Sequence, residues 1–516
     1  METPSAGTPI ILDIGSAYTK VGYAGEPKPR FVFPTITGTE KYKSVMADVS
    51  TRSIYVGDDA MKMRGVLKVS HPIQRGQIQD WNAYYEILNY IFYSLLRLDS
   101  LAFTPILYVE QPFTARETKE YIARVLFETH KVKSLIMIPS PLLSIFSVGL
   151  TNGLVIESGD GTTWIVPIIN GTIYEPAMQR LNLAGMDVNQ NLKALMMREG
   201  INLSSSAAEE FIREIKEKNC YMNLDPNIKP SSYDDKFSYP MPDGNYMSMP
   251  NHLLYEAPEV MFNPSMLGYN IMNVPQAVIY SLQMMSNEYW ADLLSHIIIS
   301  GGNMSYSGFD ERLKSELSGL IPQLGPIPKP ASAQSVKQAT KLQSLDITAK
   351  KEDTCPQCGA LVDLSDGKEN CPNCGASMRV TQLSFESDFG KSKEKKIKPG
   401  KCPYCNKSIK DLESSFCPYC GKNIDALEVP DAQEVEQALE QANAFGGAQE
   451  FTKFYEPSEE LLKLYIPKDL QFAIFNGASI LASIPSFQSY FVAYHQFQTD
   501  PNYLYRDISD ILNQGS

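Results

Sequence analysis

The chain has 516 residues, of which 43% are hydrophobic and 20% are charged, an ordinary globular composition that predicts about two to four domains. Its formal net charge of −13 argues against a protein that binds nucleic acid or an anionic membrane over its whole surface. No apolar run approaches the ~18 residues of a membrane-spanning helix, and the N-terminal sequence METPS lacks the basic and apolar regions of a secretory signal. We therefore expect a soluble protein in a reducing, cytoplasmic compartment.

Residues 9–25 (PIILDIGSAYTKVGYAG) predict a β-hairpin. An apolar strand ends at Asp13, a turn contains Gly15 and Ser16, and a second strand alternates through Val21 and Tyr23. Glycine turns let successive backbone N–H groups converge on an anion, and a carboxylate at the end of a strand can hold a hydrated magnesium ion beside it.

Residues 153–171 (GLVIESGDGTTWIVPIING) repeat this design, with Glu157 at the end of the strand and a turn from Ser158 to Gly161. Each hairpin alone is weak evidence, because hairpin turns require glycine for their conformation. Two copies that face each other would clamp the phosphates of a nucleotide. Neither copy is a Walker P-loop, because the chain contains no GxxxxGK[ST] and a strand, not a helix, follows each turn.

The composition changes at Pro322, where residues 322–344 (PQLGPIPKPASAQSVKQATKLQS) indicate a linker. Asp431 can cap the start of a later helix that Gly446 would end, and regular structure resumes near Phe454. Residues 322–454 therefore either interrupt one folded unit or separate two.

Eight of the nine cysteines form four CPxC pairs inside this block. The pairs are Cys355 and Cys358, Cys371 and Cys374, Cys402 and Cys405, and Cys417 and Cys420. Two modules result, with 12 residues between the pairs in the first and 11 in the second, a spacing typical of zinc ribbons in which four thiolates close a structural site. A disulfide framework is the alternative, which the unpaired Cys220 and the missing signal sequence disfavour. We expect two Zn²⁺ ions, in ribbons at residues 353–378 and 400–425, because segments of about 25 residues bury too little apolar surface to fold without the metal.

Eight segments resemble actin and the actin-related proteins, in the order in which that family has them. They are DIGSAYTKVGYAGEPKPRFVFPTITG (13–38), SIYVGDDAMKMRGVLKVSHPI (53–73), ESGDGTTWIVPI (157–168), RLNLAGMDV (180–188), REIKEKNCY (213–221), FNPSMLG (262–268), ISGGNMSYSGFDERL (299–313) and GASILASIPSFQ (477–488). Sugar kinases and heat-shock chaperones share the architecture of two glycine turns, but they would lack the loop at 38–60 and the motif SGGNMSYSGFDERL.

The resemblance implies an α/β fold, the actin-like duplication of ribonuclease-H-like domains with four subdomains around a nucleotide cleft, and makes the zinc ribbons an insertion. It assigns residues 1–321 and 455–516 to the actin-like fold and residues 322–454 to the insertion. Subdomain 1 would comprise 1–34, 72–147 and 473–516; subdomain 2, 35–71; subdomain 3, 148–183, 271–321 and 455–472; and subdomain 4, 184–270. A long surface insertion need not unfold its host, because loop closure costs only about 0.6 kcal/mol per doubling of length.

The resemblance also implies a site for ATP or ADP with Mg²⁺. The β- and γ-phosphates would contact Gly15, Ser16, Ala17 and Lys20 from one side and Gly159, Asp160 and Gly161 from the other. Asp13 and Glu157 would hold the hydrated magnesium. The nucleoside would contact Arg213, Lys216, Glu217 (at the ribose), Gly301, Gly302, Asn303 and Tyr306, and the candidate catalytic positions are Asp160 and Ser140. Without the motif around them, Lys216 and Glu217 would be interpreted as a solvated helix face.

Three positions depart from the family pattern. Glu157 is one methylene longer than the family's aspartate, Ser140 stands where many members carry the glutamine that positions the attacking water, and Trp164 replaces a histidine. Serine lacks the reach of glutamine, and an indole offers only a donor. Because groups of this kind contribute about 10² to 10⁴-fold in rate, we expect ATP binding with slow or negligible hydrolysis.

Two features bear on assembly. The segment 38–60 retains the length of the family's subunit-binding loop, with Met46 at its apolar tip. The groove that would receive such a loop, in which actin-binding helices also dock, would be lined by Phe146, Leu481, Ile484 and Tyr490. Core packing is the alternative role, most clearly for Leu481.

The insertion would lie near a face that the family uses for contacts between subunits. We therefore expect a cytoskeletal regulator that caps, nucleates or scaffolds, with actin or actin-related subunits and actin-binding proteins as partners. A filament-forming homologue, or an actin-related subunit of a nucleic-acid or chromatin complex, is the alternative.

The ribbons themselves would contact either proteins or nucleic acid. Residues 391–410 contain eight lysines against one glutamate, and Tyr404 and Tyr419 lie at the knuckles, a pattern that can bind phosphates and bases. A solvated linker is the more common role of a lysine run, so we expect protein partners for the ribbons and disfavour nucleic acid.

Overall fold

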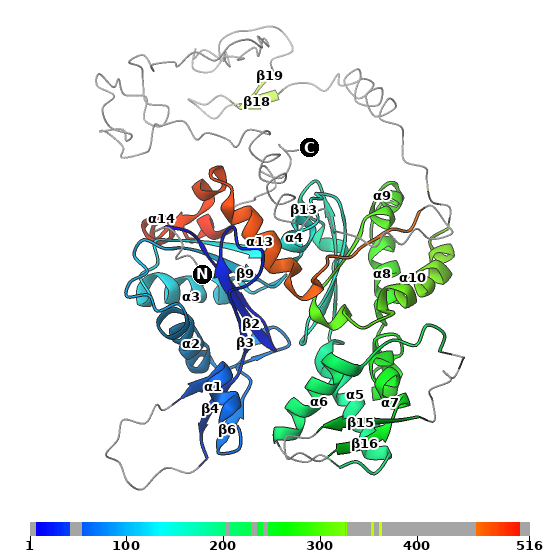
Figure 1. Ribbon diagram of the computed structural model, residues 1–516. Coiled ribbons are helices and arrows are strands. Elements are labelled where there is room, and N and C mark those ends of the chain that lie inside the picture. The colour runs from blue at the N-terminus through cyan, green and yellow to red at the C-terminus, as the bar shows by residue number, and fades with distance from the viewer. Residues whose placement is uncertain are drawn as a thin grey trace, which may run out of the picture. The chain divides into compact units, whose positions relative to one another are not determined.

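The computed structural model describes residues 7–41, 54–202, 206–226, 228, 235–240, 246–325, 327, 352–354, 361–363 and 461–505 (Figure 1). The chain divides into two compact units, one of residues 1–328 with 428–516 and the other of residues 329–427. In the second unit the described residues form an antiparallel pair, β18 (Glu352–Thr354) and β19 (Leu361–Asp363). The eight paired cysteines, the helix predicted after Asp431 and the loop tip at Met46 all lie outside the described residues.

The first sheet contains the hairpin predicted for residues 9–25, and the structure confirms it. β1 (Ile10–Ile14) pairs antiparallel with β2 (Tyr18–Tyr23), with Asp13 opposite Lys20. The six-stranded sheet has the order β21-β10-β9-β1-β2-β3, and β9 runs parallel to both β1 and β10. Its other strands are β3 (Phe31–Pro34), β9 (Pro105–Glu110), β10 (Ser134–Pro139) and β21 (Val492–Ala493).

β1 is buried on both faces, which explains its apolar run from Ile10 to Leu12. Ile10 and Leu12 belong to the same core cluster as Ile87 of α2 (Trp81–Asn89). Ile11 faces the other way and belongs to a second cluster with Leu481 of α13 (Ala473–Ser483). This alternation is the two-residue period of a strand with a helical layer on each side.

The second sheet repeats the first, and its predicted hairpin is confirmed as well. β11 (Gly153–Ser158) pairs antiparallel with β12 (Thr163–Ile169), with Glu157 opposite Trp164. The order is β13-β12-β11-β17-β20 with β14 paired to β12, and β17 runs parallel to β11 as β9 runs parallel to β1. The other strands are β13 (Thr172–Ile173), β14 (Gln179–Leu181), β17 (Ile297–Ser300) and β20 (Leu464–Tyr465).

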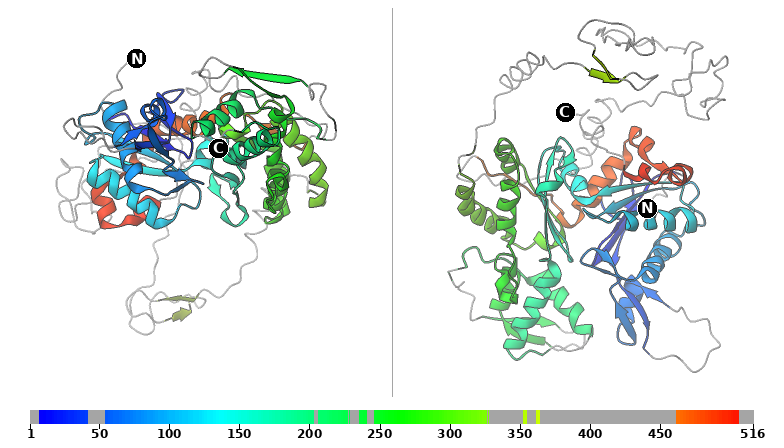
Figure 2. Two further views of the ribbon diagram at one scale, coloured as in Figure 1. Left: turned by 90° about the horizontal axis from the view of Figure 1, so that it is seen from below. Right: turned by 180° about the vertical axis from the view of Figure 1, so that it is seen from behind.

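Residues 461–505 complete both sheets, although they follow the zinc-ribbon region in the chain. β20 joins the second sheet, and β21, which leads into α14 (Tyr494–Thr499), joins the first. α13 packs so closely against α4 (Ser140–Phe146) that a Cβ atom on Gly477 would lie 1.9 Å from the carbonyl oxygen of Leu143, so only glycine fits there. The opposed views of Figures 1 and 2 both show the orange and red α13 and α14 beside blue and cyan elements from the start of the chain.

The remaining elements surround the two sheets. The other α-helices are α1 (Gly57–Lys62), α3 (Arg116–Arg124), α5 (Gly185–Arg198), α6 (Ser206–Asn219), α7 (His252–Glu256), α8 (Val274–Gln283), α9 (Trp290–Ser295) and α10 (Phe309–Leu320), and α2 and α3 continue as the π-helical turns η1 (Tyr90–Leu95) and η2 (Val125–Thr129). Short 3₁₀ helices are η3 (Glu175–Ala177), η4 (Pro258–Met261), η5 (Pro264–Leu267), η6 (Asn287–Tyr289), η7 (Gly302–Met304), η8 (Ile321–Leu324), η9 (Leu470–Phe472), η10 (Ser486–Tyr490) and η11 (Pro501–Tyr505). The small sheets are β4 (Thr37–Glu40) with β5 (Tyr55–Val56) and β6 (Leu67–Ser70), β7 (Ile73–Gln74) with β8 (Gln77–Ile78), and β15 (Lys236–Pro240) with β16 (Tyr246–Pro250). Among the residues described, no helix has both the length and the apolar character needed to cross a bilayer.

The apolar groove predicted for subunit contacts is not open at the positions that were assigned to it. Phe146, Leu481 and Ile484 are at most 5% exposed, and Tyr490 packs partly buried against the same cluster. That cluster also contains residues of both sheets, so these side chains fill the core between the sheets. The expectation of an accessible groove is therefore wrong for Phe146, Leu481 and Ile484, whose role is core packing, whereas Tyr490 is only partly buried.

Candidate functional site

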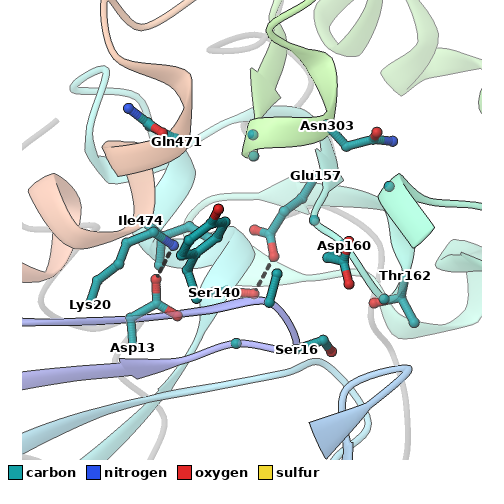
Figure 3. Close-up of a pocket in the computed structure, with 18 of the residues that line it drawn as sticks. Asp13, Ser16, Lys20, Ser140, Glu157, Asp160, Thr162, Asn303, Gln471 and Ile474 are labelled. Carbon is teal, nitrogen blue, oxygen red and sulfur yellow. Dashed lines mark hydrogen bonds and ion pairs between the residues drawn. The ribbon is translucent and has the colours of Figure 1, made fainter. Parts of the chain in front are cut away.

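A cavity of about 500 Å³ lies at the two glycine turns, with walls from both sheets, from α6 and from the start of η7 (Figure 3). Its volume is within the ~300–1,000 Å³ range of pockets that hold small molecules. The cavity brings together most of the residues predicted for the site. These are Asp13, Gly15, Ser16, Ala17, Lys20, Ser140, Glu157, Gly159, Asp160, Gly161, Lys216, Glu217, Gly301, Gly302, Asn303 and Tyr306.

Two residues singled out from the sequence do not line this cavity. Arg213 lines an adjoining cavity of about 330 Å³, which shares Ser16 and Asp160 with the larger one. Trp164 is 3% exposed and packs against Phe113, with ring centroids 6.0 Å apart. The indole is thus a core side chain, and Arg213 reaches the site only from beside it.

The first turn presents one cation that already has a carboxylate partner. Lys20 Nζ lies 2.8 Å from Asp13 Oδ2, and Figure 3 shows the pair beside the cavity. The backbone N–H of Gly15 donates to the carbonyl of Tyr18 at 3.1 Å, which closes the turn. Asp13 and Lys20 are opposite each other in the β1–β2 ladder, so the register of the hairpin brings the two side chains together.

The second turn is held by the start of α5. The N–H groups of Gly185 and Met186 donate to the carbonyls of Gly159 and Asp160, at 3.1 and 2.9 Å. The two turns also approach each other closely, since a Cβ atom on Gly161 would lie 2.6 Å from the Oγ atom of Ser16. Glycine at position 161 thus lets Ser16 and the backbone of Arg75, whose Cα would lie 3.0 Å from such a Cβ atom, approach the second turn closely.

Two buried oxygens of residues that line the cavity, Asp160 Oδ1 and Glu110 Oε2, have no hydrogen-bond partner among the described residues. The Oδ1 atom of Asp160 is buried without a donor, and the nearest cation is Lys216 Nζ at 3.7 Å. A buried acceptor without a donor costs free energy, so a ligand hydroxyl or a metal-bound water would be favoured here. The described residues contain no group of three or more acidic, histidine or cysteine side chains that could enclose an ion. The carboxylates of Asp13, Glu157 and Asp160 line the same cavity, and oxygen ligands of this kind suit a hydrated divalent cation such as Mg²⁺.

Glu157 is held by two serine hydroxyls of α4. Ser140 Oγ donates to Glu157 Oε1 at 2.6 Å, and Ser144 Oγ donates to Oε2 at 3.1 Å. The carboxyl is 8% exposed, and burial raises the pKa of Glu157 to about 7 although both serine hydrogen bonds lower it. Ser144 was not predicted from the sequence; its spacing of four residues from Ser140, one helical turn, is the signal that could have revealed it.

The end of the cavity at Asn303 and Tyr306 is built on a buried hydrogen-bond chain. Asn303 Nδ2 donates to Ser158 Oγ at 3.0 Å, and the Tyr306 hydroxyl donates to Asn303 Oδ1 at 2.9 Å. Gly301 has a φ of +96°, and a Cβ atom there would lie 2.1 Å from the carbonyl oxygen of Ser158. The Tyr306 hydroxyl thus holds the Asn303 side chain in place, and Asn303 in turn holds Ser158 at the wall of the cavity.

Several lining residues were not predicted. They are Ile14, Tyr18, Val32, Val109, Glu110, Gln111, Thr162, Gly185, Cys220, Ser305, Gln471, Phe472 and Ile474. Glu110 could have been found, because it ends β9, which runs parallel to β1, and the carboxyl ends of parallel strands meet at one edge of a sheet. Lys119 Nζ lies 2.8 Å from it, and burial raises the pKa of its carboxyl.

Two family models match this chain. The model described as Actin matches residues 5–360, which is more than half of the sequence, and the model described as Double zinc ribbon matches residues 355–421, which include all eight paired cysteines. The actin-type fold agrees with the duplicated sheets and the cavity between their glycine turns. The chain therefore belongs to the actin family and carries a double zinc ribbon domain within its sequence.

Proposed function

We propose that this protein binds ATP or ADP with Mg²⁺ in the cavity at the glycine turns and acts in the cytoplasm as a nucleotide-bound regulator of actin-type assemblies. The observation that carries the nucleotide part is the pair of glycine turns that line one cavity, with Lys20 and Lys216 among the lining residues. Converging backbone N–H groups and cations favour a polyphosphate. The carboxylates of Asp13 and Glu157 would hold the ion through water, and Glu217 would face the ribose.

Slow hydrolysis is part of the proposal. A bound magnesium ion would neutralise charge that develops on the phosphates. The two positions that would orient the attacking water in the family are poorly suited to it here, because the Ser140 hydroxyl donates to Glu157 and the Trp164 indole does not line the cavity. Both observations support an enzyme that keeps its nucleotide for long periods.

Replacing Gly159 with alanine should weaken nucleotide binding about tenfold or more while leaving the free protein folded. Gly159 lines the cavity, and a Cβ atom added to it would meet no atom of the described residues within 4 Å, so the methyl group would occupy space that a phosphate needs. Titration calorimetry with MgATP measures the change.

The matched control is Gly319→Ala. Gly319 is also open to a Cβ atom, but it lies in α10 and does not line the cavity. This variant should bind nucleotide as the parent does and be slightly more stable, because alanine favours a helix over glycine by about 0.5–1 kcal/mol. Equal affinities in all three proteins would contradict the proposed phosphate site.

The regulatory part is tested on the full chain by sedimentation and phosphate release in the same MgATP sample. A regulator should stay in the supernatant and release phosphate about 10² to 10⁴-fold more slowly than a filament-forming actin. Protein that pellets and hydrolyses ATP as such an actin does would instead establish the filament-forming alternative. Deleting residues 322–454 shows whether the zinc-ribbon insertion decides the outcome, and copurification would identify protein partners of the ribbons.

A further inference from the structure

Tyr18 joins the two sides of the cavity. It is the first residue of β2, directly after the first glycine turn. Its hydroxyl donates to the carboxylate of Glu217 on α6, at 3.0 Å from Oε2 and 3.3 Å from Oε1. Both residues line the cavity, so the contact spans the space where the ligand would lie.

The two residues belong to different halves of the fold. Tyr18 is in the first sheet, whereas α6 packs through Ile212 and Ile215 into the core cluster of the second sheet. The Arg213 guanidinium, also on α6, lies 5.9 Å from the centroid of the Tyr18 ring. The ring is partly buried, but the hydrogen bond itself is exposed, so a ligand can reach it from solvent.

The geometry of the contact matches that of a diol. A single phenol hydroxyl within hydrogen-bond distance of both oxygens occupies the side of the carboxylate that two neighbouring hydroxyl groups would use together. The 2′- and 3′-hydroxyls of a ribose are such a pair. A ribose and Tyr18 would therefore compete for Glu217.

We propose that the Tyr18 hydroxyl occupies the position on the Glu217 carboxylate that the ribose hydroxyls would take. A bound nucleotide would then displace the hydroxyl and break the hydrogen bond between Tyr18 and Glu217, which connects the two sides of the cavity. The inference rests on the proposed nucleotide site and adds to it a residue that lowers affinity for ribonucleotides. It also means that an occupied cavity lacks one cross-connection that the empty cavity has.

The experiment compares Tyr18→Phe with the parent, both as the full chain, for MgATP and for Mg-2′,3′-dideoxy-ATP. Phenylalanine keeps the ring and removes the competing hydroxyl, so ATP should bind about three- to tenfold more tightly to the variant. The dideoxy nucleotide has no hydroxyl to compete for Glu217, so its affinity should be the same for both proteins.

The matched control is Tyr494→Phe. The Tyr494 hydroxyl also donates to a glutamate, Glu128, at 3.4 Å, but neither residue lines the cavity. This variant should bind both nucleotides as the parent does.

Two outcomes overturn the inference, and they are distinct. If Tyr18→Phe changes the affinity for both nucleotides by the same factor, the hydroxyl only tightens the cavity and does not compete with the ribose. If neither nucleotide binds the parent protein at millimolar concentration, the proposed nucleotide site itself fails.

Discussion

Replacing Arg75 with alanine is expected to lower the free energy of unfolding by about 3 kcal/mol. Arg75 makes a bidentate ion pair with Asp187, at 2.6 Å from Oδ2 and 2.7 Å from Oδ1, and the Asp187 side chain is 0% exposed. Removing one partner of a buried pair typically costs about 3–5 kcal/mol, because the other charge stays buried. The low end applies, since the backbone N–H of Ala184 and the Tyr269 hydroxyl still donate to Asp187.

Arg75 also belongs to a hairpin that contacts both glycine turns. Arg75 adopts a φ of +48° between β7 and β8, and it also donates to the carbonyl of Gly161 in the second glycine turn. The following N–H, that of Gly76, donates to Ser16 in the first turn. The hairpin therefore fastens both turns to each other beside the cavity.

The measurement is denaturant unfolding followed by tryptophan fluorescence. All three tryptophans, Trp81, Trp164 and Trp290, lie in the unit of residues 1–328 with 428–516, so the signal reports that unit. Arg124→Ala is the matched control, because Arg124 pairs with Glu120 at 3.5 Å on the surface, where an ion pair contributes about 0–1 kcal/mol. Equal losses in both variants would show that the Arg75 pair is no stronger than a surface pair.

The contacts that tie the two sides of the cavity together are the part of the site that the sequence does not reveal. Arg75 and Asp187 are 112 residues apart, and Tyr18 and Glu217 are 199 apart. No spacing rule links side chains at such separations. These contacts depend on how the two sheets meet, which only the folded chain shows.

The turns themselves are predictable because their signals are local. In each hairpin an apolar run, an acidic residue and a glycine turn follow one another within 19 residues or fewer, and both register and burial agree with that pattern. Glu157 shows the limit of the same reasoning. Its extra methylene is visible in the sequence, and the four-residue spacing of Ser140 and Ser144 can place both on one face of a helix. That both hydroxyls donate to the Glu157 carboxyl depends on the packing of α4 on β11, which the sequence does not show.

Side-chain exposure is the other property that motif matching misjudges. Phe146, Leu481 and Ile484 match a family groove by position, yet they are buried between the sheets. An apolar residue in a motif can lie either in a core or in an exposed groove, so its identity in the sequence does not tell whether it is buried or accessible. Partners of this chain therefore have to be sought by experiment, not by transferring groove residues.

Zinc removal should have the largest effect on the chain, and the effect should be confined to the insertion. Structural zinc supplies about 10–16 kcal/mol in small finger peptides, as much as the whole stability of a typical domain. A strong chelator should therefore make residues 355–421, the double zinc ribbon, sensitive to protease. Tryptophan-monitored unfolding should not change, because the three tryptophans lie in the other unit and the cost of closing a loop depends only weakly on its length.

Zinc content tests the ligand assignment directly. Eight paired cysteines at four per ion predict two zinc ions per chain, and replacing Cys355 and Cys358 with serine should leave one. Cys220→Ser is the control, because Cys220 is buried in the other unit and burial raises the pKa of its thiol to about 12. The Cys220→Ser variant should therefore still contain two zinc ions per chain. A chelator that shifts the unfolding transition followed by tryptophan fluorescence would contradict the expectation that zinc stabilises only the ribbons. The metal would then stabilise the actin-type unit itself. If the shift is absent while assembly with partners is lost, the ribbons act through the contacts they make and not through the fold that carries them.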